Sequence, residues 1–361
     1  MRHDAIAAQV LRQDVQALQA YAVQPSAGFI KLDVMENPYR LPAHLQAELG
    51  QRLGAVALNR YPAERIEDLR AALAAHARLP EGCALMLGNG SDELISLLTL
   101  AVARPGATVL APEPSFVMYR LACQLLGAQS GPRFVGLPCR AEDFALDVPA
   151  LLEAIAKERP ALLWLAYPNN PTGTLWDAGA IEQLIGAMQG HGLVVMDEAY
   201  QPFAERDSMD WLRRHPHVLL MRTLSKFGLA GVRIGYLMGR SEWVAQIEKL
   251  RPPFNVSVLN AEAALFALEH AQVFAEQAEA IRTERERLFG ALQALPGVTP
   301  FPSQANMVLA RFPDAAATFA RLKGQGILVK NVGGMHPLLH NCLRLTVGTP
   351  AENTALIEAL K

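Results

Sequence analysis

The middle of the chain alternates short apolar runs with longer stretches of helical periodicity. The apolar runs that predict strands are Ala84–Leu87, Thr108–Ala111, Phe134–Leu137, Leu162–Ala166, Leu193–Met196, Val218–Met221 and Ile234–Met238. Helices are predicted between them, at about 92–103, 115–127, 147–157, 178–190 and 208–214. Because most of these runs are apolar throughout, we expect strands buried on both faces, joined by right-handed crossovers. The pattern predicts an α/β fold whose seven-stranded sheet is mostly parallel.

The flanks of this middle part follow other patterns. Residues 4–20 have apolar positions at helical spacing and predict an amphipathic arm, and the proline- and glycine-containing segment after it is typical of a linker between domains. Further helices are predicted at 43–53 and 64–77. Residues 257–294 predict a long charged helical stretch, and Val298–Lys361 predicts a smaller α+β unit. The expected division is an arm and linker (1–36), a large domain (37–250) and a small C-terminal domain (251–361).

Composition narrows the class of protein. The chain has 361 residues, of which 51% are hydrophobic and 19% charged, enough to fill the cores of two domains. Its net charge of −2 provides no basic field, so neither nucleic acid nor an anionic membrane is an expected partner. A small anionic metabolite fits better.

Cysteines and the amino terminus indicate the compartment. The four cysteines are widely spaced and form no CxxC pair, which favours buried thiols over a zinc site or a disulfide framework. The first residues lack the basic and then apolar regions of a signal peptide, and apolar runs such as Leu94–Ala103 are too short to cross a bilayer. A cytoplasmic location is the expectation.

Lys226 is the first candidate for chemistry. The predicted strand at Val218–Met221 leads to Ser225 and Lys226 in a loop that also contains Gly228 and Gly231. Burial of an ammonium favours the neutral amine, which can act as a Schiff-base nucleophile. A solvated lysine just past a strand is the alternative.

Three other motifs follow apolar runs in the same way. They are Gly88–Glu93 (GNGSDE), Asn169–Gly173 (NNPTG) and Asp197–Tyr200 (DEAY). In a doubly wound sheet, the carboxyl ends of the strands meet at one edge, where ligands bind. We therefore expect all three motifs to lie near Lys226. A dinucleotide fingerprint is a weak alternative for GNGSDE, since glutamate stands where its third glycine should be.

The order of these motifs, with the Ser-Lys pair and a later arginine, resembles the fold-type-I, pyridoxal-phosphate-dependent aminotransferases, and in detail the chain is similar to histidinol-phosphate aminotransferases. The resemblance covers nearly the whole chain. It implies a cytoplasmic homodimer that uses pyridoxal 5′-phosphate to transaminate histidinol phosphate with 2-oxoglutarate, giving imidazole acetol phosphate and glutamate, in L-histidine biosynthesis. Two alternatives stay open: an aminotransferase for aromatic or other amino acids, and a decarboxylase of a phosphorylated amino acid.

The resemblance also implies roles around the cofactor ring. Lys226 would hold the cofactor covalently and then move a proton between the substrate carbon and the cofactor. Asp197 would keep the pyridine nitrogen protonated. Asn170 and Tyr200 would donate hydrogen bonds to the phenolic oxygen of the ring, and Phe116 would stack on its face.

A second group would hold the cofactor phosphate. It consists of the backbone N–H groups of Ser91 and Asp92 at a helix start, with Ser225 and Arg233. Arg233 follows Lys226 by seven residues, one fewer than in other members of the family, so the loop between them is shortened. Tyr61 matches a tyrosine that the family directs at the phosphate in the neighbouring subunit.

For the substrate, Arg344 matches the arginine that the superfamily uses to bind a carboxylate, and a guanidinium can grip a carboxylate or a phosphate with two hydrogen bonds. Lys330 could add a second positive charge, and the resemblance places Tyr21 and Asn37 near the active site. No metal is expected. His336 and His340, like His215 and His217, lack a nearby carboxylate or cysteine partner.

Overall fold

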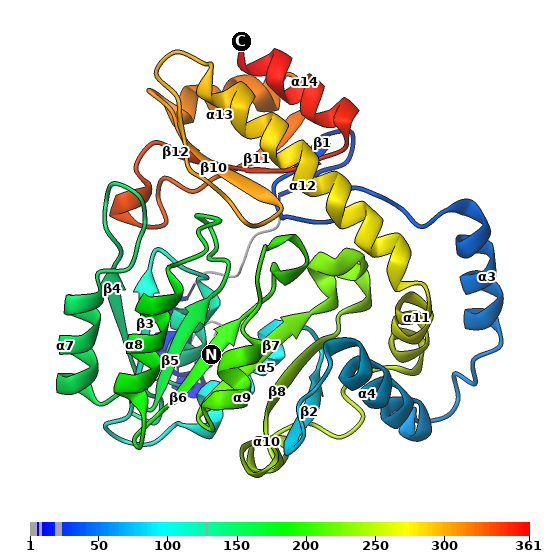
Figure 1. The fold of residues 1–361 in the computed structure, drawn as a ribbon, viewed down its shortest axis with the longest axis vertical. Coiled ribbons are helices and arrows are strands. Elements are labelled where there is room, and N and C mark those ends of the chain that lie inside the picture. The colour runs from blue at the N-terminus through cyan, green and yellow to red at the C-terminus, as the bar shows by residue number, and fades with distance from the viewer. Residues whose placement is uncertain (1–5, 7–8, 19–23, 128) are drawn as a thin grey trace.

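The computed structural model describes residues 6, 9–18, 24–127 and 129–361, which form two packed units (Figure 1). The larger unit contains a seven-stranded sheet with the strand order β2-β8-β7-β6-β5-β3-β4. Its strands are β2 (Cys83–Gly88), β3 (Thr108–Glu113), β4 (Arg133–Pro138), β5 (Leu162–Ala166), β6 (Leu193–Asp197), β7 (Val218–Thr223) and β8 (Gly235–Arg240). Each predicted strand is present, and the predicted α/β fold class is confirmed.

Strand directions also agree with the prediction of a mostly parallel sheet. The five strands β4, β3, β5, β6 and β7 run parallel to their neighbours, and only β8 runs antiparallel, to both β7 and β2. The carboxyl ends of the parallel strands therefore lie along one edge of the sheet. The polar residues that follow β5, β6 and β7 in the sequence are brought together there.

Helices cover both faces of this sheet (Figure 1). They include α5 (Ser91–Ala101), α6 (Met118–Leu126), α7 (Val148–Glu158), α8 (Ala178–Met188), α9 (Met209–Arg214) and α10 (Ser241–Glu248). Strand β5 shows how one segment serves two cores, because Leu163 and Leu165 pack on one face while Leu162 and Trp164 pack on the other. This two-sided burial explains why the strand is apolar at every position.

The smaller unit is built on a five-stranded sheet with the order β1-β11-β12-β10-β9. Its strands are β1 (Ile30–Leu32), β9 (Thr299–Pro300), β10 (Met307–Arg311), β11 (Ile327–Asn331) and β12 (Cys342–Thr346), and its helices include α13 (Ala315–Gly324) and α14 (Pro350–Leu360). Strand β1 comes from the predicted linker and pairs parallel with β11. The amino-terminal segment therefore completes the carboxyl-terminal unit.

The prediction of one long charged helical stretch at 257–294 needs correction. Two helices occupy it, α11 (Val258–Glu269) and α12 (Ala271–Gln293), separated at His270. Helix α11 is buried from Ala261 to Ala267, and it packs on α3 (Ala43–Gly54) and α4 (Ala63–Ala77) of the larger unit. Of the two glutamates in α11, Glu262 is buried and pairs with Arg52 and Arg65, whereas most charged residues of the stretch belong to α12. The bounds of the three predicted domains stay predictions.

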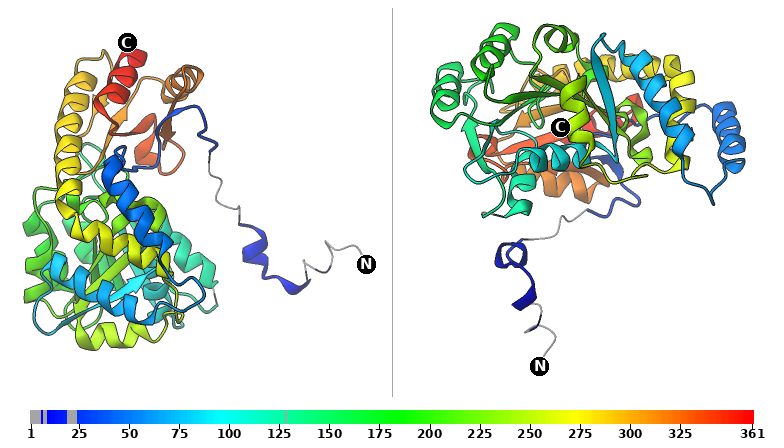
Figure 2. Two further views of the ribbon diagram at one scale, coloured as in Figure 1. Left: turned by 90° about the vertical axis from the view of Figure 1, so that its right-hand side faces the viewer. Right: turned by 90° about the horizontal axis from the view of Figure 1, so that it is seen from below.

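The predicted amphipathic arm is also interrupted within its described residues. Helix α2 covers only Gln13–Gln16, since Arg12 has an extended backbone (φ −56°, ψ 139°) and Leu11 lies in a bend. Figure 2 shows α2 projecting from the body of the molecule, where the Arg12 guanidinium donates to the Leu125 carbonyl oxygen (2.6 Å). In the described part of the chain, no helix has the length and apolar character needed to span a bilayer.

Candidate active site

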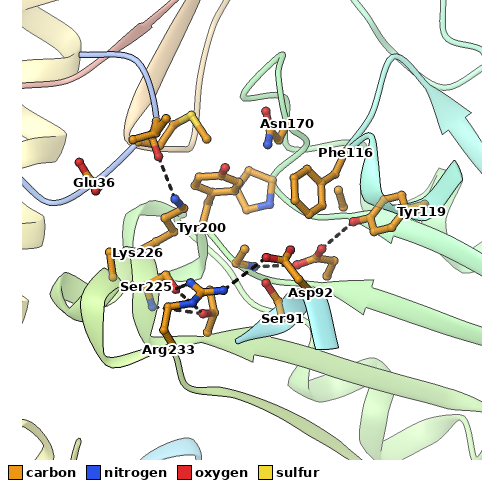
Figure 3. Close-up of a pocket in the computed structure, with 18 of the residues that line it drawn as sticks. Glu36, Ser91, Asp92, Phe116, Tyr119, Asn170, Tyr200, Ser225, Lys226 and Arg233 are labelled. Atoms are coloured by element: carbon orange, nitrogen blue, oxygen red, sulfur yellow. Dashed lines mark hydrogen bonds and ion pairs between the residues drawn. The ribbon is translucent and has the colours of Figure 1, made fainter. Parts of the chain in front are cut away.

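A cavity of about 330 Å³ lies at the carboxyl edge of the large sheet (Figure 3). Nine of the predicted site residues line it: Ser91, Asp92, Phe116, Asn170, Asp197, Tyr200, Ser225, Lys226 and Arg233. Residues 34–36, which follow β1, line it too. Residues of the three motifs and Lys226 thus meet at the carboxyl edge of the sheet, as the sequence predicted.

Lys226 lies in a short helical turn, Ser225–Leu229, just after β7. Its Nζ donates a hydrogen bond to the Val34 carbonyl oxygen at 3.0 Å. Burial, followed by the positive charge of Arg344, lowers the pKa of Lys226 to about 8. A larger fraction of this amine is therefore neutral near pH 7 than for an ordinary lysine, as a nucleophile requires.

Asp197 is the last residue of β6 and is buried. Its Oδ2 accepts from the Tyr119 hydroxyl at 2.6 Å, and its Oδ1 accepts from the Ala199 N–H at 3.0 Å. Burial raises the pKa of Asp197 to about 6. Tyr119 is held by stacking on Trp164 (4.6 Å between ring centroids). A carboxylate fixed in this way can face a protonated ring nitrogen.

Glu198, the second acidic residue of the DEAY motif, forms a buried ion pair instead of facing the cavity. Glu198 is buried and accepts from the Arg222 Nε (2.7 Å) and from the backbone N–H of Ser208 (2.5 Å). Arg222 itself is buried in β7. Because β6 and β7 are adjacent, this ion pair joins the two strand ends that carry Asp197 and the lysine loop.

Ser91 is the first residue of α5, so free N–H groups of the first turn point at the cavity wall. Arg233 lies beside this helix start: its Nη1 donates to Ser225 Oγ (3.4 Å) and its Nη2 to Asp92 Oδ2 (3.3 Å). Gly90 has a φ of 79°, a conformation that favours glycine, and a Cβ there would come within 2.4 Å of Arg233 Nη2 and displace the guanidinium. Serine hydroxyls, a guanidinium and a helix start form a donor set that suits a phosphate.

Tyr200 and Asn170 lie on the walls of the same cavity. Tyr200 is 4% exposed, and burial raises its pKa, which keeps its hydroxyl protonated and able to donate. Asn170 accepts through Oδ1 from Arg344 Nη1 at 2.8 Å. Phe116 faces the cavity, with its ring edge to Tyr119.

Arg344 comes from β12 of the small unit and is buried. Besides Asn170, it contacts the Asp33 carbonyl oxygen through Nη2 at 2.7 Å. Lys330 in β11 stands directly opposite Arg344 in the antiparallel ladder, so the two side chains share one face of the small sheet. Lys330 is half-buried and does not line the cavity wall.

Four described residues of the predicted set do not line the cavity: Arg344, Lys330, Asn37 and Tyr61. Asn37 lies behind the lysine loop, where its Nδ2 donates to Gln277 Oε1 (2.9 Å) and the Phe227 carbonyl oxygen (3.4 Å). Tyr61 is 76% exposed and stacks on Phe254 (4.3 Å between centroids). Tyr21 lies outside the described residues.

Among the residues that the structure describes, no three His, Cys, Asp or Glu side chains gather as a metal site. His215 Nε2 contacts Glu182 Oε1 (2.8 Å), and His217 Nε2 contacts the Ile185 carbonyl oxygen (2.9 Å). His336 Nδ1 accepts from the Leu338 N–H (3.2 Å). These contacts account for three of the four histidines considered above.

Sequence reasoning missed several residues of the cavity. Tyr119 and Thr223 line it from α6 and β7, and Glu36 lines it from the segment after β1. Tyr119 follows Phe116 by three residues within the helix predicted at 115–127, a spacing that could have indicated a shared face, although α6 begins only at Met118. Glu36 had no comparable signal, since its position depends on the pairing of β1 with the distant β11.

Comparisons with known proteins agree with this geometry. Residues 27–360 match the family described as aminotransferase class I and II. The chain is 66% identical to a histidinol-phosphate aminotransferase of Methylibium petroleiphilum (98% of this chain and 94% of that one) and 59% identical to one of Polaromonas naphthalenivorans (98% and 95%). It also resembles the crystal structure of histidinol-phosphate aminotransferase from Sinorhizobium meliloti in complex with pyridoxal-5′-phosphate (TM-score 0.84, 27% identity, 98% and 96% covered). The chain therefore belongs to the aminotransferases of class I and II, in one group with the histidinol-phosphate aminotransferases.

Proposed function

We propose that the chain transfers the amino group of histidinol phosphate to 2-oxoglutarate, giving imidazole acetol phosphate and glutamate, as a step in histidine biosynthesis. The observation that carries the proposal is the placement of an anion-binding arginine, Arg344, next to the amine-bearing cavity of Lys226. High identity to histidinol-phosphate aminotransferases over nearly the whole chain supports the same substrate.

Pyridoxal 5′-phosphate is the cofactor, and the cavity residues suit each part of it. When bound, it supplies an aldehyde carbon that bonds an amine and a ring that takes up an electron pair. Ser91, Ser225 and Arg233 would hold its phosphate. Asp197 would face its ring nitrogen, and Phe116 would cover one face of the ring. The raised pKa of the buried Asp197 calls for a cationic partner, which a protonated ring nitrogen provides.

Lys226 performs the proton transfer. With its pKa lowered to about 8, its amine can take a proton from the substrate carbon and return it without a large energetic penalty. The Val34 carbonyl oxygen, 3.0 Å away, orients the amine within the cavity. Tyr200 and Asn170 donate hydrogen bonds to the ring oxygen of the cofactor, which stabilises its deprotonated form.

Arg344 binds the anionic arm of both substrates. Histidinol phosphate carries a phosphate where glutamate carries a carboxylate, and a guanidinium can hold either through two parallel hydrogen bonds. Lys330, opposite Arg344 across the β11–β12 ladder, adds positive charge on the same face of the sheet. A dianionic phosphate gains more from this second charge than a carboxylate does.

Single-turnover measurements on the wild-type enzyme test the substrate. We expect histidinol phosphate to transfer its amino group to the bound cofactor faster than histidinol or phenylalanine. Histidinol has no anionic arm for Arg344, and the singly charged carboxylate of phenylalanine gains less from Arg344 and Lys330 than a dianionic phosphate does. The absorbance change of the cofactor reports the transfer. Faster reaction of phenylalanine would favour an aromatic aminotransferase, and release of carbon dioxide from a phosphorylated amino acid would favour a decarboxylase.

The proposal includes a homodimer in which Tyr61 acts in the neighbouring subunit. Tyr61 lies at an exposed turn between α3 and α4, away from the cavity of its own chain. Phe254, on which Tyr61 stacks, and Leu58 are also exposed, so they add apolar surface that a second copy can cover. An exposed tyrosine that does not line the cavity of Lys226 suits a role across an interface.

Mixing Lys226→Ala protomers with Tyr61→Ala protomers should restore activity. In the mixed dimer, one site then combines an intact Lys226 with an intact Tyr61, and the other carries both defects. Recovery toward half the wild-type rate per mixed dimer is expected in steady-state assays. The control mixes Lys226→Ala with Asp197→Asn, two residues of one cavity, which should restore nothing. Equal rates in the two mixtures would place Tyr61 in its own subunit or outside the site.

A cytoplasmic location belongs to the same proposal. Histidinol phosphate, 2-oxoglutarate and glutamate are charged metabolites that do not cross membranes unaided, so the enzyme must share their compartment.

A further inference from the structure

The carboxylate of Glu36 lies in the wall of the cavity, and the reaction proposed above gives it no role. Glu36 follows β1 and lines the cavity together with Val34 and Met35 (Figure 3). One of its oxygens, Oε2, accepts from Lys31 Nζ. The other oxygen, Oε1, accepts no hydrogen bond from the residues that the structure describes, so it has acceptor capacity left for a ligand.

The other acidic residues of the cavity are engaged. Asp197 accepts from the Tyr119 hydroxyl and from a backbone N–H, and Asp92 pairs with Arg233 at the phosphate-binding end. Within the described lining of the cavity, Glu36 is therefore the acidic side chain that can accept a new donor.

The backbone that carries Glu36 is held in a fixed relation to Arg344, while the Glu36 side chain itself is 46% exposed. The preceding residue, Met35, is buried in the left-handed conformation (φ 55°), and its N–H donates to Thr346 Oγ1 (3.0 Å). The Met35 carbonyl oxygen accepts from Asn306 Nδ2 (3.0 Å). Thr346 lies two residues from Arg344 on β12, and Arg344 itself contacts the Asp33 carbonyl oxygen. The same strand thus anchors both charged groups.

Opposite charges stand around the reacting amine. Both Arg344 and Glu36 act on the charge of Lys226, the arginine lowering its pKa and the glutamate raising it. The two arms of histidinol phosphate match these two charges. The carbon that bears its amine carries a phosphate arm, which suits Arg344, and an imidazole arm, which suits Glu36. With the phosphate on Arg344, the imidazole arm needs a hydrogen-bond acceptor.

Resting on the proposed function, we propose that Glu36 determines specificity by accepting a hydrogen bond from the imidazole N–H of histidinol phosphate. If the imidazole is neutral, the carboxylate binds it through this hydrogen bond. If the imidazole is protonated, the two also form an ion pair. A phenyl ring fills a similar volume but offers no donor, so it would cover Glu36 Oε1 without replacing the hydrogen bonds that this oxygen makes to water. Glu36 therefore selects for imidazole over phenyl.

The test compares two substrates that share the phosphate arm and differ in the ring: histidinol phosphate, whose imidazole offers an N–H donor, and phenylalaninol phosphate, whose phenyl ring offers none. In the wild-type holoenzyme, kcat/KM should favour histidinol phosphate by about 10- to 100-fold, the range expected for a hydrogen bond to a charged acceptor. Glu36→Gln should reduce this preference to within a few-fold. Lys31→Gln serves as the matched control, because it removes the partner of Glu36 and leaves its carboxylate, and should keep the preference. Arg344→Gln should slow both substrates alike.

The outcomes separate this inference from the proposed function. If the wild-type enzyme does not transaminate histidinol phosphate, the proposed function fails whatever Glu36 does. If it does, and Glu36→Gln still prefers histidinol phosphate over phenylalaninol phosphate by tenfold or more, the role of Glu36 is overturned and the proposed function stands. Equal melting temperatures of the wild type and Glu36→Gln exclude a general loss of structure, and Glu36→Ala provides a second test of the same preference.

Discussion

Lys226→Ala should lose amino-group transfer almost completely, by at least about 10⁴-fold, because it removes both the amine that bonds the cofactor and the base that moves the proton. No other lysine lines the described cavity, so no neighbour can replace it. Initial rates with histidinol phosphate and 2-oxoglutarate measure the loss. The variant should stay folded, since alanine suits the helical turn at Ser225–Leu229.

Covalent attachment gives a second measurement on the same variant. Borohydride makes the bond between a lysine amine and the cofactor permanent, and mass spectrometry of peptides then locates it. We expect the modified peptide to contain residue 226 in the wild type and in Lys249→Ala, a control at the carboxyl end of α10, where Lys249 Nζ donates to Gln246 Oε1 and does not line the cavity. A cofactor fixed to another lysine in Lys226→Ala would contradict the assignment of the nucleophile.

Asp197→Asn should bind the cofactor yet slow the reaction by about 10³-fold, within the range for loss of an acid–base group. An amide has no charge with which to keep the ring nitrogen protonated, so the ring withdraws electrons less strongly. The Tyr119 hydroxyl can still donate to the amide oxygen, which should preserve the local packing. Single-turnover rates and cofactor content per chain are the measurements.

Tyr119→Phe is the matched comparison for Asp197. It removes one hydrogen bond to the carboxylate and keeps the negative charge, so we expect a loss of about tenfold, much smaller than for Asp197→Asn. Comparable losses in the two variants would show that positioning by Tyr119, and not the charge of Asp197, carries the effect.

Much of the large unit could be predicted because its strands are buried on both faces. Such strands are continuous apolar runs, and the polar motifs GNGSDE, NNPTG and DEAY directly follow them. The parallel arrangement then places those motifs at one edge without knowledge of any side-chain contact. The predicted residues that line the cavity come from this part of the chain.

The remaining features depend on contacts between distant segments. Strand β1 has only three residues, too few for a periodic signal, and its partner is β11. The helical stretch breaks at His270 between α11, which is buried against α3 and α4, and the charged helix α12. The charged residues of α12 dominated the pattern, so the buried helix before it was not recognised as separate. Asn37 was expected near the substrate, but its amide is engaged by Gln277 of α12. Local patterns carry no information on such long-range pairings.

The pairing of β1 with β11 has a consequence for synthesis of the protein. Ile30 leaves the ribosome long before its partner Ile327 is made. Until then, the segment that offers the Val34 carbonyl oxygen to Lys226 and the Asp33 carbonyl oxygen to Arg344 has no sheet to join. Contacts between such distant residues form slowly, because a long loop must close first. Nascent chains therefore carry an incomplete cavity until β11 has been made and has left the ribosome.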